Sequence, residues 1–160
     1  MPESKTGPPG PGTNSMSAEF LDTNVLVYAL DRSSAERHDQ AREVVTRLVR
    51  TGRGCLSIQV LQELYWVLTR KAPRPVSAGH ALAVVEKLCV LPVFSPVPGD
   101  VLAAGRFAED ACISFWDAMI VQAAARMGAR ILWTEDLNDG QTIAGVLIRS
   151  PFRPPMVSEP

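Results

Sequence analysis

The sequence predicts a three-layer α/β fold, in which helices cover both faces of a mostly parallel central sheet. Short apolar segments typical of buried strands alternate with longer segments whose apolar residues recur at helical spacing. Polar, glycine-containing or proline-containing breaks separate these segments. Helices separate all the expected strands except the last two, so most neighbouring strands should run parallel.

The first half of the chain contains two strand-and-helix groups. The first strand should end at Asp22, with Thr23 or Asn24 capping the helix that follows. The next amphipathic helix should close at Gly52, and two prolines should stop the helix after the second strand. We therefore expect strands at residues 19–22 and 55–58, and helices at residues 25–30, 35–50 and 59–71.

The second half continues the alternation. Pro98 is expected in the first turn of one helix, and Gly128 should end an alanine-rich helix. The turn Asn138-Asp139-Gly140 should separate the last two strands. We therefore expect helices at residues 76–90, 98–112 and 118–127, and strands at residues 90–94, 130–134 and 143–148.

Length and composition are those of one globular domain. The chain has 160 residues, of which 46% are hydrophobic, so it can bury a normal core. Residues 1–17 are rich in Pro, Gly, Ser and Thr and are expected to be disordered. We expect the domain to span residues 18–152, with a C-terminal tail at residues 153–160.

Charge and cysteine content exclude several classes of protein. The formal net charge of −1 excludes a strongly basic nucleic-acid-binding protein, so any RNA or DNA contact must come from a local patch. Cys55, Cys89 and Cys112 are far apart and odd in number, which argues against a disulfide framework or a zinc site. No membrane-spanning run or signal-peptide core is visible, and a reducing cytoplasm is expected.

Four carboxylates should lie at the same edge of the sheet. Each follows a strand or lies in the first turns of a helix behind one, and ligands of open α/β sheets bind at the carboxyl ends of the strands. Unpaired carboxylates gathered there would repel one another, and a hard divalent cation would remove that penalty. Together they predict a metal-dependent phosphoryl-transfer or hydrolytic site. The four residues are Asp22, Glu63, Asp117 and Asp136.

Each of these acids also has a simpler explanation when taken alone. Capping a helix would by itself explain Asp22 and Asp117, and Glu63 could reach solvent or pair with an arginine. Asp136 could be a turn residue, and Asp139 competes with it for the fourth position. The argument for a site therefore depends on the four residues converging.

The same residues resemble the motifs of the PIN-domain family, and most closely those of the VapC-type toxin ribonucleases of bacterial type II toxin–antitoxin pairs. The resemblance runs from about Phe20 to Phe152, and the fourth acid varies between Asp and Asn in the family. The matching segments are Leu21-Asp22-Thr23-Asn24-Val25-Leu26, Glu63 in a helix, Trp116-Asp117-Ala118 and Trp133-Thr134-Glu135-Asp136-Leu137.

The resemblance implies a Mg²⁺- or Mn²⁺-dependent endoribonuclease that hydrolyses RNA with metal-activated water. Asp22, Glu63 and Asp117 would hold the metal directly or through water, and Asp136 would complete the cluster or bind a second ion. It also implies a homodimer and a cognate antitoxin protein. The residues expected to orient the acids or contact phosphate are Thr23, Asn24, Ser114 and Thr134.

Other readings remain open. A haloacid-dehalogenase-like phosphatase also has an Asp after its first strand, but its Asp-x-Asp motif needs a second acid where this chain has Asn24. A catalytically weak PIN-like module that binds RNA or protein is the main alternative, although a degenerate site should have lost one of the four acids. No phosphate-binding glycine loop of the dinucleotide or Walker type occurs. Four basic residues flank the site segments and are candidates to bind substrate phosphates, but they are better explained as solvated surface charges; these are Arg32, Arg70, Lys71 and Arg74.

Overall fold

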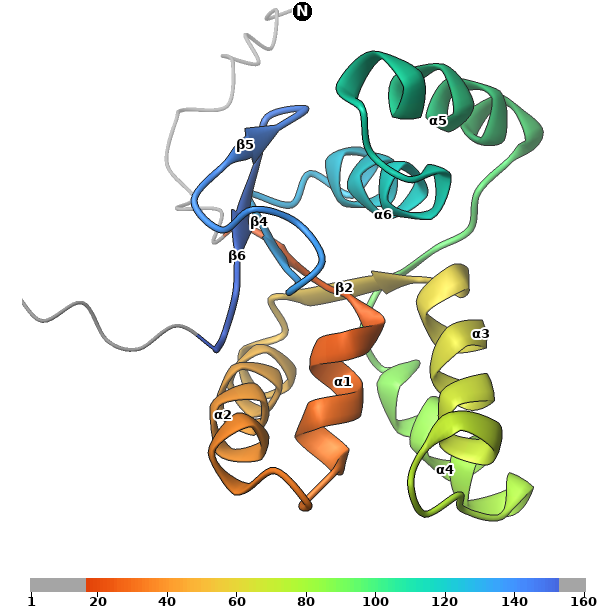
Figure 1. Cartoon of the computed structure of the whole chain (residues 1–160), viewed down its shortest axis with the longest axis vertical. Helices are drawn as coiled ribbons and strands as arrows, with labels where there is room; N and C mark the ends of the chain where they lie inside the picture. Colours follow the sequence, from red (N-terminus) through yellow and green to blue (C-terminus); the bar gives the residue numbers. More distant parts are fainter. Residues whose placement is uncertain (1–16, 153–160) are drawn as a thin grey trace, which may run out of the picture.

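A six-stranded sheet forms the centre of the computed structural model, which describes residues 17–152 (Figure 1). The strand order is β3-β2-β1-β4-β6-β5, and every neighbouring pair is parallel except β5 and β6. The predicted mostly parallel α/β sheet is therefore confirmed. The strands are β1 Glu19–Leu21, β2 Gly54–Ser57, β3 Val93–Phe94, β4 Ile131–Trp133, β5 Thr142–Ile143 and β6 Val146–Arg149.

Helices cover both faces of the sheet, as predicted. Figure 1 shows α5 and α6 on one side of the strands, and α1 to α4 on the other. The elements are α1 Thr23–Leu30, α2 Ala35–Thr51, α3 Ile58–Trp66, the π-helical turn η1 Val67–Lys71, α4 Ala78–Leu88, α5 Pro98–Ala111 and α6 Phe115–Arg126. Within residues 17–152, none of these helices is both long and apolar enough to cross a membrane. The N-terminal extension expected at residues 1–17, apart from Ser17, and the tail expected at residues 153–160 lie outside the described residues.

The core lies on both sides of the two central strands. Phe20 and Leu21 of β1 and Leu132 of β4 have no exposed surface. Burial of both faces explains why these strands read as continuous apolar runs instead of alternating ones. The alanines of α6 let this helix pack closely on the sheet, and Ala118 and Ala124 are completely buried.

Two predicted boundaries near the functional edge are wrong. The N-cap of α1 is Asp22 itself, not Thr23 or Asn24, because β1 ends at Leu21 and Asp22 is the last residue with extended dihedral angles. The last helix on the sheet begins at Phe115, not at residue 118, because the Ser114 side chain accepts the backbone N–H of Asp117. Both changes place an acid within the start of a helix.

The helix predicted over residues 59–71 is not a continuous α-helix. After Trp66 it widens into η1, where the N–H of Ala72 donates to the carbonyl of Val67 at 2.9 Å. The hydroxyl of Thr69 also donates to the carbonyl of Tyr65 at 2.8 Å. Pro73 has no N–H to continue the α-helical ladder, so the wider turn satisfies the last available carbonyls.

The single strand predicted over residues 143–148 is instead a hairpin of β5 and β6. Ala144 and Gly145 have φ values of 50° and 78°, which are the left-handed conformations of a tight two-residue turn. Alanine rarely adopts this conformation, so the turn left little signal in the sequence.

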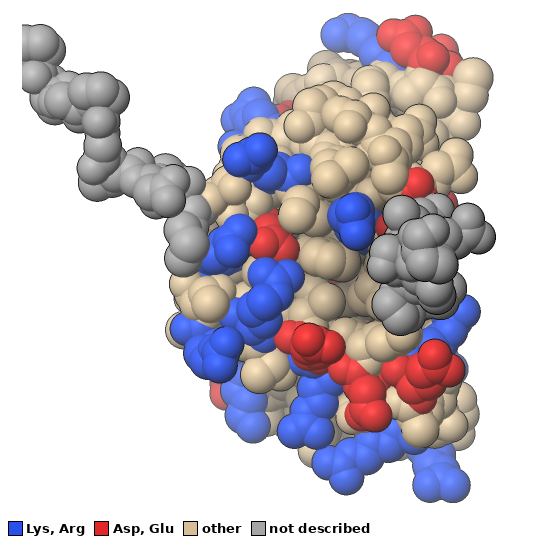
Figure 2. Space-filling model, turned by 90° about the vertical axis from the view of Figure 1, so that its left-hand side faces the viewer, with Lys and Arg blue, Asp and Glu red and all other residues tan. Residues whose placement is uncertain are grey.

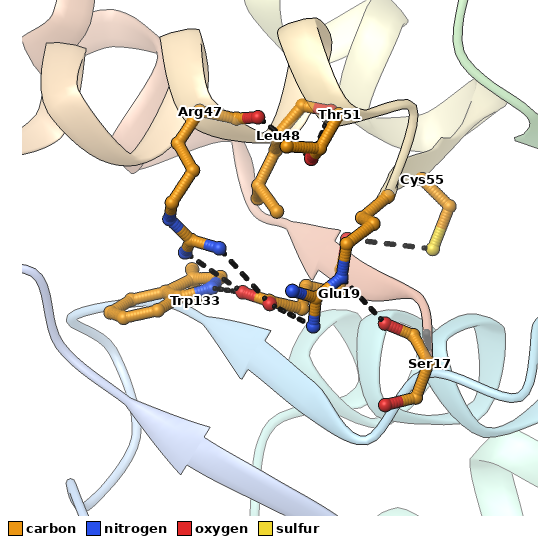
Figure 3. A network of polar contacts seen from close by, with 8 residues as sticks. Ser17, Glu19, Arg47, Leu48, Thr51, Cys55 and Trp133 are labelled. Carbon is orange, nitrogen blue, oxygen red and sulfur yellow. Dashed lines mark hydrogen bonds and ion pairs between the residues drawn. The ribbon is translucent and has the colours of Figure 1, made fainter. Parts of the chain in front are cut away.

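A buried ion-pair network fixes the edge of the sheet opposite to Asp22 (Figure 3). Glu19, at the start of β1, is 3% exposed and forms ion pairs with Arg47 at 3.0 Å and Arg53 at 2.8 Å. The indole N–H of Trp133 donates to the same carboxylate at 2.7 Å. Burial alone would raise the pKa of Glu19, but the Arg47 and Trp133 hydrogen bonds and the two arginine charges outweigh it and lower that pKa. The network ties β1, β4 and α2 together.

Candidate active site

Asp22 lies at the carboxyl end of β1 and is only 5% exposed. Its Oδ1 accepts the N–H of Thr23 at 2.7 Å, and its Oδ2 accepts the hydroxyl of Thr134 at 2.8 Å. Burial, together with the charges of Asp136 and Glu63, raises the pKa of Asp22 to about 7, although the hydrogen bonds from Thr134 and Thr23 act to lower it. An acid held in this way favours a cation beside it.

The residues that follow Asp22 connect it to two other predicted acids. The Thr23 hydroxyl donates to Oε2 of Glu63 at 2.9 Å, across 40 positions of sequence. The Asn24 amide donates to Oδ2 of Asp136 at 2.9 Å, across 112 positions. The first turn of α1 therefore connects the α3 acid and the acid after β4 to the end of β1.

Asp117 lies in the first turn of α6, half-buried, with its own partner. The Ser114 hydroxyl donates to Oδ2 of Asp117 at 2.7 Å and accepts the Asp117 N–H at 3.0 Å. Gln59 links this turn to the other acids, because its amide donates to Oε1 of Glu63 at 2.9 Å and to the carbonyl of Trp116 at 3.5 Å.

Gln59 was missed in the sequence, although one signal was available. It precedes Glu63 by four positions on the same helix, which is the spacing at which two side chains meet. The four residues expected to orient acids each hydrogen-bond to one of them in the structure: Thr23 to Glu63, Asn24 to Asp136, Ser114 to Asp117 and Thr134 to Asp22.

The described residues do not form a finished metal cage. Among residues 17–152, no three Cys, His, Asp or Glu side chains lie together in a group able to hold an ion. The charges of Glu63 and Asp136 act on Asp22, whereas Asp117 is linked to Glu63 through Gln59, which also contacts the start of α6. The expectation that all four acids gather around one ion therefore stays a prediction.

The donor chemistry still fits a hard divalent cation. Carboxylate and amide oxygens are the ligands that Mg²⁺ and Mn²⁺ prefer. Within residues 17–152, Oδ1 of Asn24 is buried without a hydrogen-bond partner, on the same side chain whose amide nitrogen donates to Asp22 and Asp136. Mutual repulsion, which helps to raise the pKa of Asp22, is the penalty that such an ion would remove.

The geometry also separates the two candidates for the fourth acid. Asp136 accepts a hydrogen bond from Asn24, whereas Asp139 accepts the N–H of Ser150 at 2.6 Å and lies 3.9 Å from Arg149. Asp139 therefore joins its turn to the end of β6, and Asp136 faces the first turn of α1.

A family model described as the PIN domain matches residues 20–139. The chain belongs to the PIN-domain family. Solved structures show the same fold at low sequence identity. No curated protein sequence matches this PIN domain significantly.

Three of the similar structures come from bacterial toxin–antitoxin systems. DNA-bound VapBC from Salmonella typhimurium has a TM-score of 0.60 and 22% identity, covering 85% of this chain and 99% of that one. A toxin–antitoxin complex from Klebsiella pneumoniae has a TM-score of 0.62 and 15% identity, covering 84% and 98%. VapC20 from Mycobacterium tuberculosis, a sarcin-ricin loop cleaving toxin, has a TM-score of 0.58 and 22% identity, covering 72% and 87%. At these identities the likeness establishes the fold.

A hollow of this PIN domain lies along α2, a helix that carries none of the four predicted acids. It has a volume of about 420 Å³ and is lined by α2, whose Arg47 reaches Glu19 at the opposite edge of the sheet. Figure 2 shows a face of the molecule on which basic and acidic side chains are interleaved. The lining of the hollow also contains both acidic and basic side chains, so it lacks the uniform positive charge of a phosphate-binding groove. The lining residues are Asp39, Arg42, Glu43, Thr46, Arg47 and Arg50.

Proposed function

We propose that this PIN domain is a metal-dependent endoribonuclease and the toxin of a type II toxin–antitoxin pair. The observation that carries the proposal is Asp22, a buried acid at the carboxyl end of a central strand whose pKa is raised to about 7. Glu63 and Asp136 contribute to that shift, and all three are sequence matches to the family motif. Membership of the PIN-domain family and the likeness to VapC20 support RNA as the substrate.

The residues would divide the work as follows. Asp22, Glu63 and Asp117 would hold Mg²⁺ or Mn²⁺ directly or through water, with Asp136 completing the set or holding a second ion. The bound metal would activate water and neutralise charge on the phosphodiester.

The hydrogen-bonded residues would keep the acids in the orientation that binding requires. Thr134 fixes one oxygen of Asp22, and Thr23 fixes one oxygen of Glu63. Ser114 holds Asp117 against the start of α6. Groups fixed in advance lose less freedom when the ion and substrate bind, and partners of this kind commonly affect metal affinity.

A cognate antitoxin and a second copy of this chain are the proposed protein partners. The Salmonella and Klebsiella structures are complexes of a toxin with its antitoxin. Co-expression with a cognate antitoxin should yield an inactive complex, and removal of that partner should restore cleavage. Light scattering on the purified chain would test the homodimer.

The function is tested by Asp22→Asn, which keeps the size and polarity of the side chain but removes its charge. We expect wild-type protein to cleave RNA in the presence of Mg²⁺ or Mn²⁺. Chelation of the metal by EDTA should abolish this cleavage. The variant should lose at least about a hundredfold of that activity and should remain folded. Gel analysis of RNA cleavage and circular dichroism give the two readouts.

Asp100→Asn is the matched control. Asp100 is also 5% exposed and also lies at the start of a helix, where it accepts the N–H of Val97 at 2.8 Å and pairs with Arg126 at 3.3 Å. It should lose stability but keep its cleavage rate per folded molecule. Equal cleavage by the Asp22 variant and wild type would remove the catalytic assignment, and RNA binding without cleavage would favour the binding-module alternative.

A further inference from the structure

Two tryptophans on the acid-bearing helices are largely exposed to water. The exposed fraction is 63% for Trp116 and 54% for Trp66. Trp133, by contrast, is half-buried and donates to Glu19 at the other edge of the sheet. An indole offers a large, rigid apolar face with a polar N–H, and two of them on the helices that carry Glu63 and Asp117 are candidates for contacts with a ligand.

Trp116 is adjacent to the site in both sequence and space. It directly precedes Asp117 in the first turn of α6, and its carbonyl accepts the Gln59 amide that also bonds Glu63. Phe115 packs against the indole edge-on, with ring centroids 5.2 Å apart and planes at 69°. The backbone of Trp116 is therefore held at the border of the acids, and its exposed ring packs against Phe115.

Trp66 extends the site along α3. It follows Glu63 by three positions, which places both side chains on one side of the helix. Arg70 follows Trp66 by four positions in η1 and is exposed. An acid, an indole and a cation thus succeed one another along α3 and η1.

We propose that Trp116 and Trp66 stack unpaired bases of the RNA on the two sides of the phosphate to be cut, and that Arg70 binds a phosphate of the same strand. This inference rests on the proposed function and adds that the substrate is single-stranded at the cut site. Bases inside a duplex hide their faces, whereas unpaired bases stack on aromatic side chains with little sequence preference.

The surroundings of the indoles favour RNA over a protein partner. Ile58 is the other exposed apolar side chain of α3, and exposed Gln62 lies between it and Trp66 on the helix surface. Glu63 is also beside Trp66, so polar side chains interrupt the apolar surface there. Isolated rings beside acids and a cation suit stacked bases and phosphates, whereas a stable protein interface needs contiguous apolar area.

The test compares substitutions that keep or remove the aromatic face. Trp116→Leu and Trp66→Leu keep apolar bulk, whereas Trp116→Phe and Trp66→Phe keep a ring. Binding is measured in the cleavage-deficient Asp22→Asn protein with Mg²⁺, by fluorescence anisotropy of a short unstructured RNA and of its duplex. Leu102→Ala on α5 is the control, because Leu102 is 61% exposed and lies on another helix.

We expect each leucine variant to bind the single strand about tenfold more weakly, which is the size of one lost base stack. The phenylalanine variants should stay within about threefold of the parent, and Leu102→Ala should bind normally. Arg70→Ala should reduce the salt dependence of log Kd by roughly 0.7, the value for one phosphate of a single strand. The duplex should bind more weakly than the single strand and should not respond to the tryptophan changes.

Unchanged single-strand binding by both leucine variants would overturn the inference. Loss of the dimer mass in light scattering, with RNA binding intact, would assign the rings to a protein interface and would also overturn it. Failure of the proposed function would give a different result. Wild-type protein would then cleave no RNA in the presence of metal, regardless of how the tryptophan variants bind RNA.

Discussion

The buried carboxyl group of Asp22 should make stability depend on pH in the direction opposite to most acids. Its folded-state pKa is about 7, whereas an aspartate in an unfolded chain titrates near pH 4 (about 3.9). Between these values the folded protein binds more protons than the unfolded chain, so raising the pH favours unfolding. In EDTA, the free energy of unfolding of wild type should fall by roughly 1–4 kcal/mol from pH 4 to pH 8 relative to Asp22→Asn. Urea unfolding across this range measures the difference, and parallel curves would show that Asp22 has the same pKa in the folded and unfolded states.

Among the strands, β1 depends on the contacts of Glu19 at its other end. Glu19→Gln removes the charge that Arg47 and Arg53 share, while an amide of the same shape remains. We expect a loss of roughly 1–3 kcal/mol, less than for a fully buried pair because both arginines are partly exposed. Urea unfolding measures the loss, and Glu43→Gln on the exposed face of α2 is the control. Cleavage per folded molecule should not change, since the network lies at the opposite edge of the sheet; equal unfolding of the two variants would contradict the assignment.

The elements that periodicity identifies well are those with strong local signals. The sheet type, the two helical layers and the long helix α2 were all predicted, because apolar spacing and the Gly52 stop mark them clearly. The π turn after Trp66 and the hairpin at Ala144 were not, because each replaces a local preference with a conformation that its neighbours require. The cap at Asp22 was displaced by one residue, which is within the usual uncertainty of an element's end.

For the site, the sequence predicted which residues take part but not how their side chains are arranged in space. Strand ends and helix starts indicated which acids share an edge of the sheet, and the structure links Asp22, Glu63 and Asp136 through Thr23 and Asn24. Sequence spacing could not give the side-chain direction of Asp117 on its own helix, nor the role of Gln59 as the link between helices. These depend on how α3 and α6 pack, which is set by contacts distant in the chain.

For the molecule as a whole, an ion at this site would join segments that are remote in sequence, because Thr23 to Glu63 spans 40 positions and Asn24 to Asp136 spans 112. A ligand that binds only the folded state stabilises it according to its concentration and affinity. We expect Mg²⁺ or Mn²⁺ at about ten times its Kd to raise the melting temperature of wild type by roughly 3–6 °C at pH 8. The shift should shrink at pH 6, since protons compete with the metal for Asp22. Differential scanning fluorimetry should show no shift for Asp22→Asn and a normal shift, from a lower starting temperature, for Asp100→Asn. An equal shift in all three proteins would mean that the ion binds elsewhere, and the acids at the end of β1 would then need another explanation.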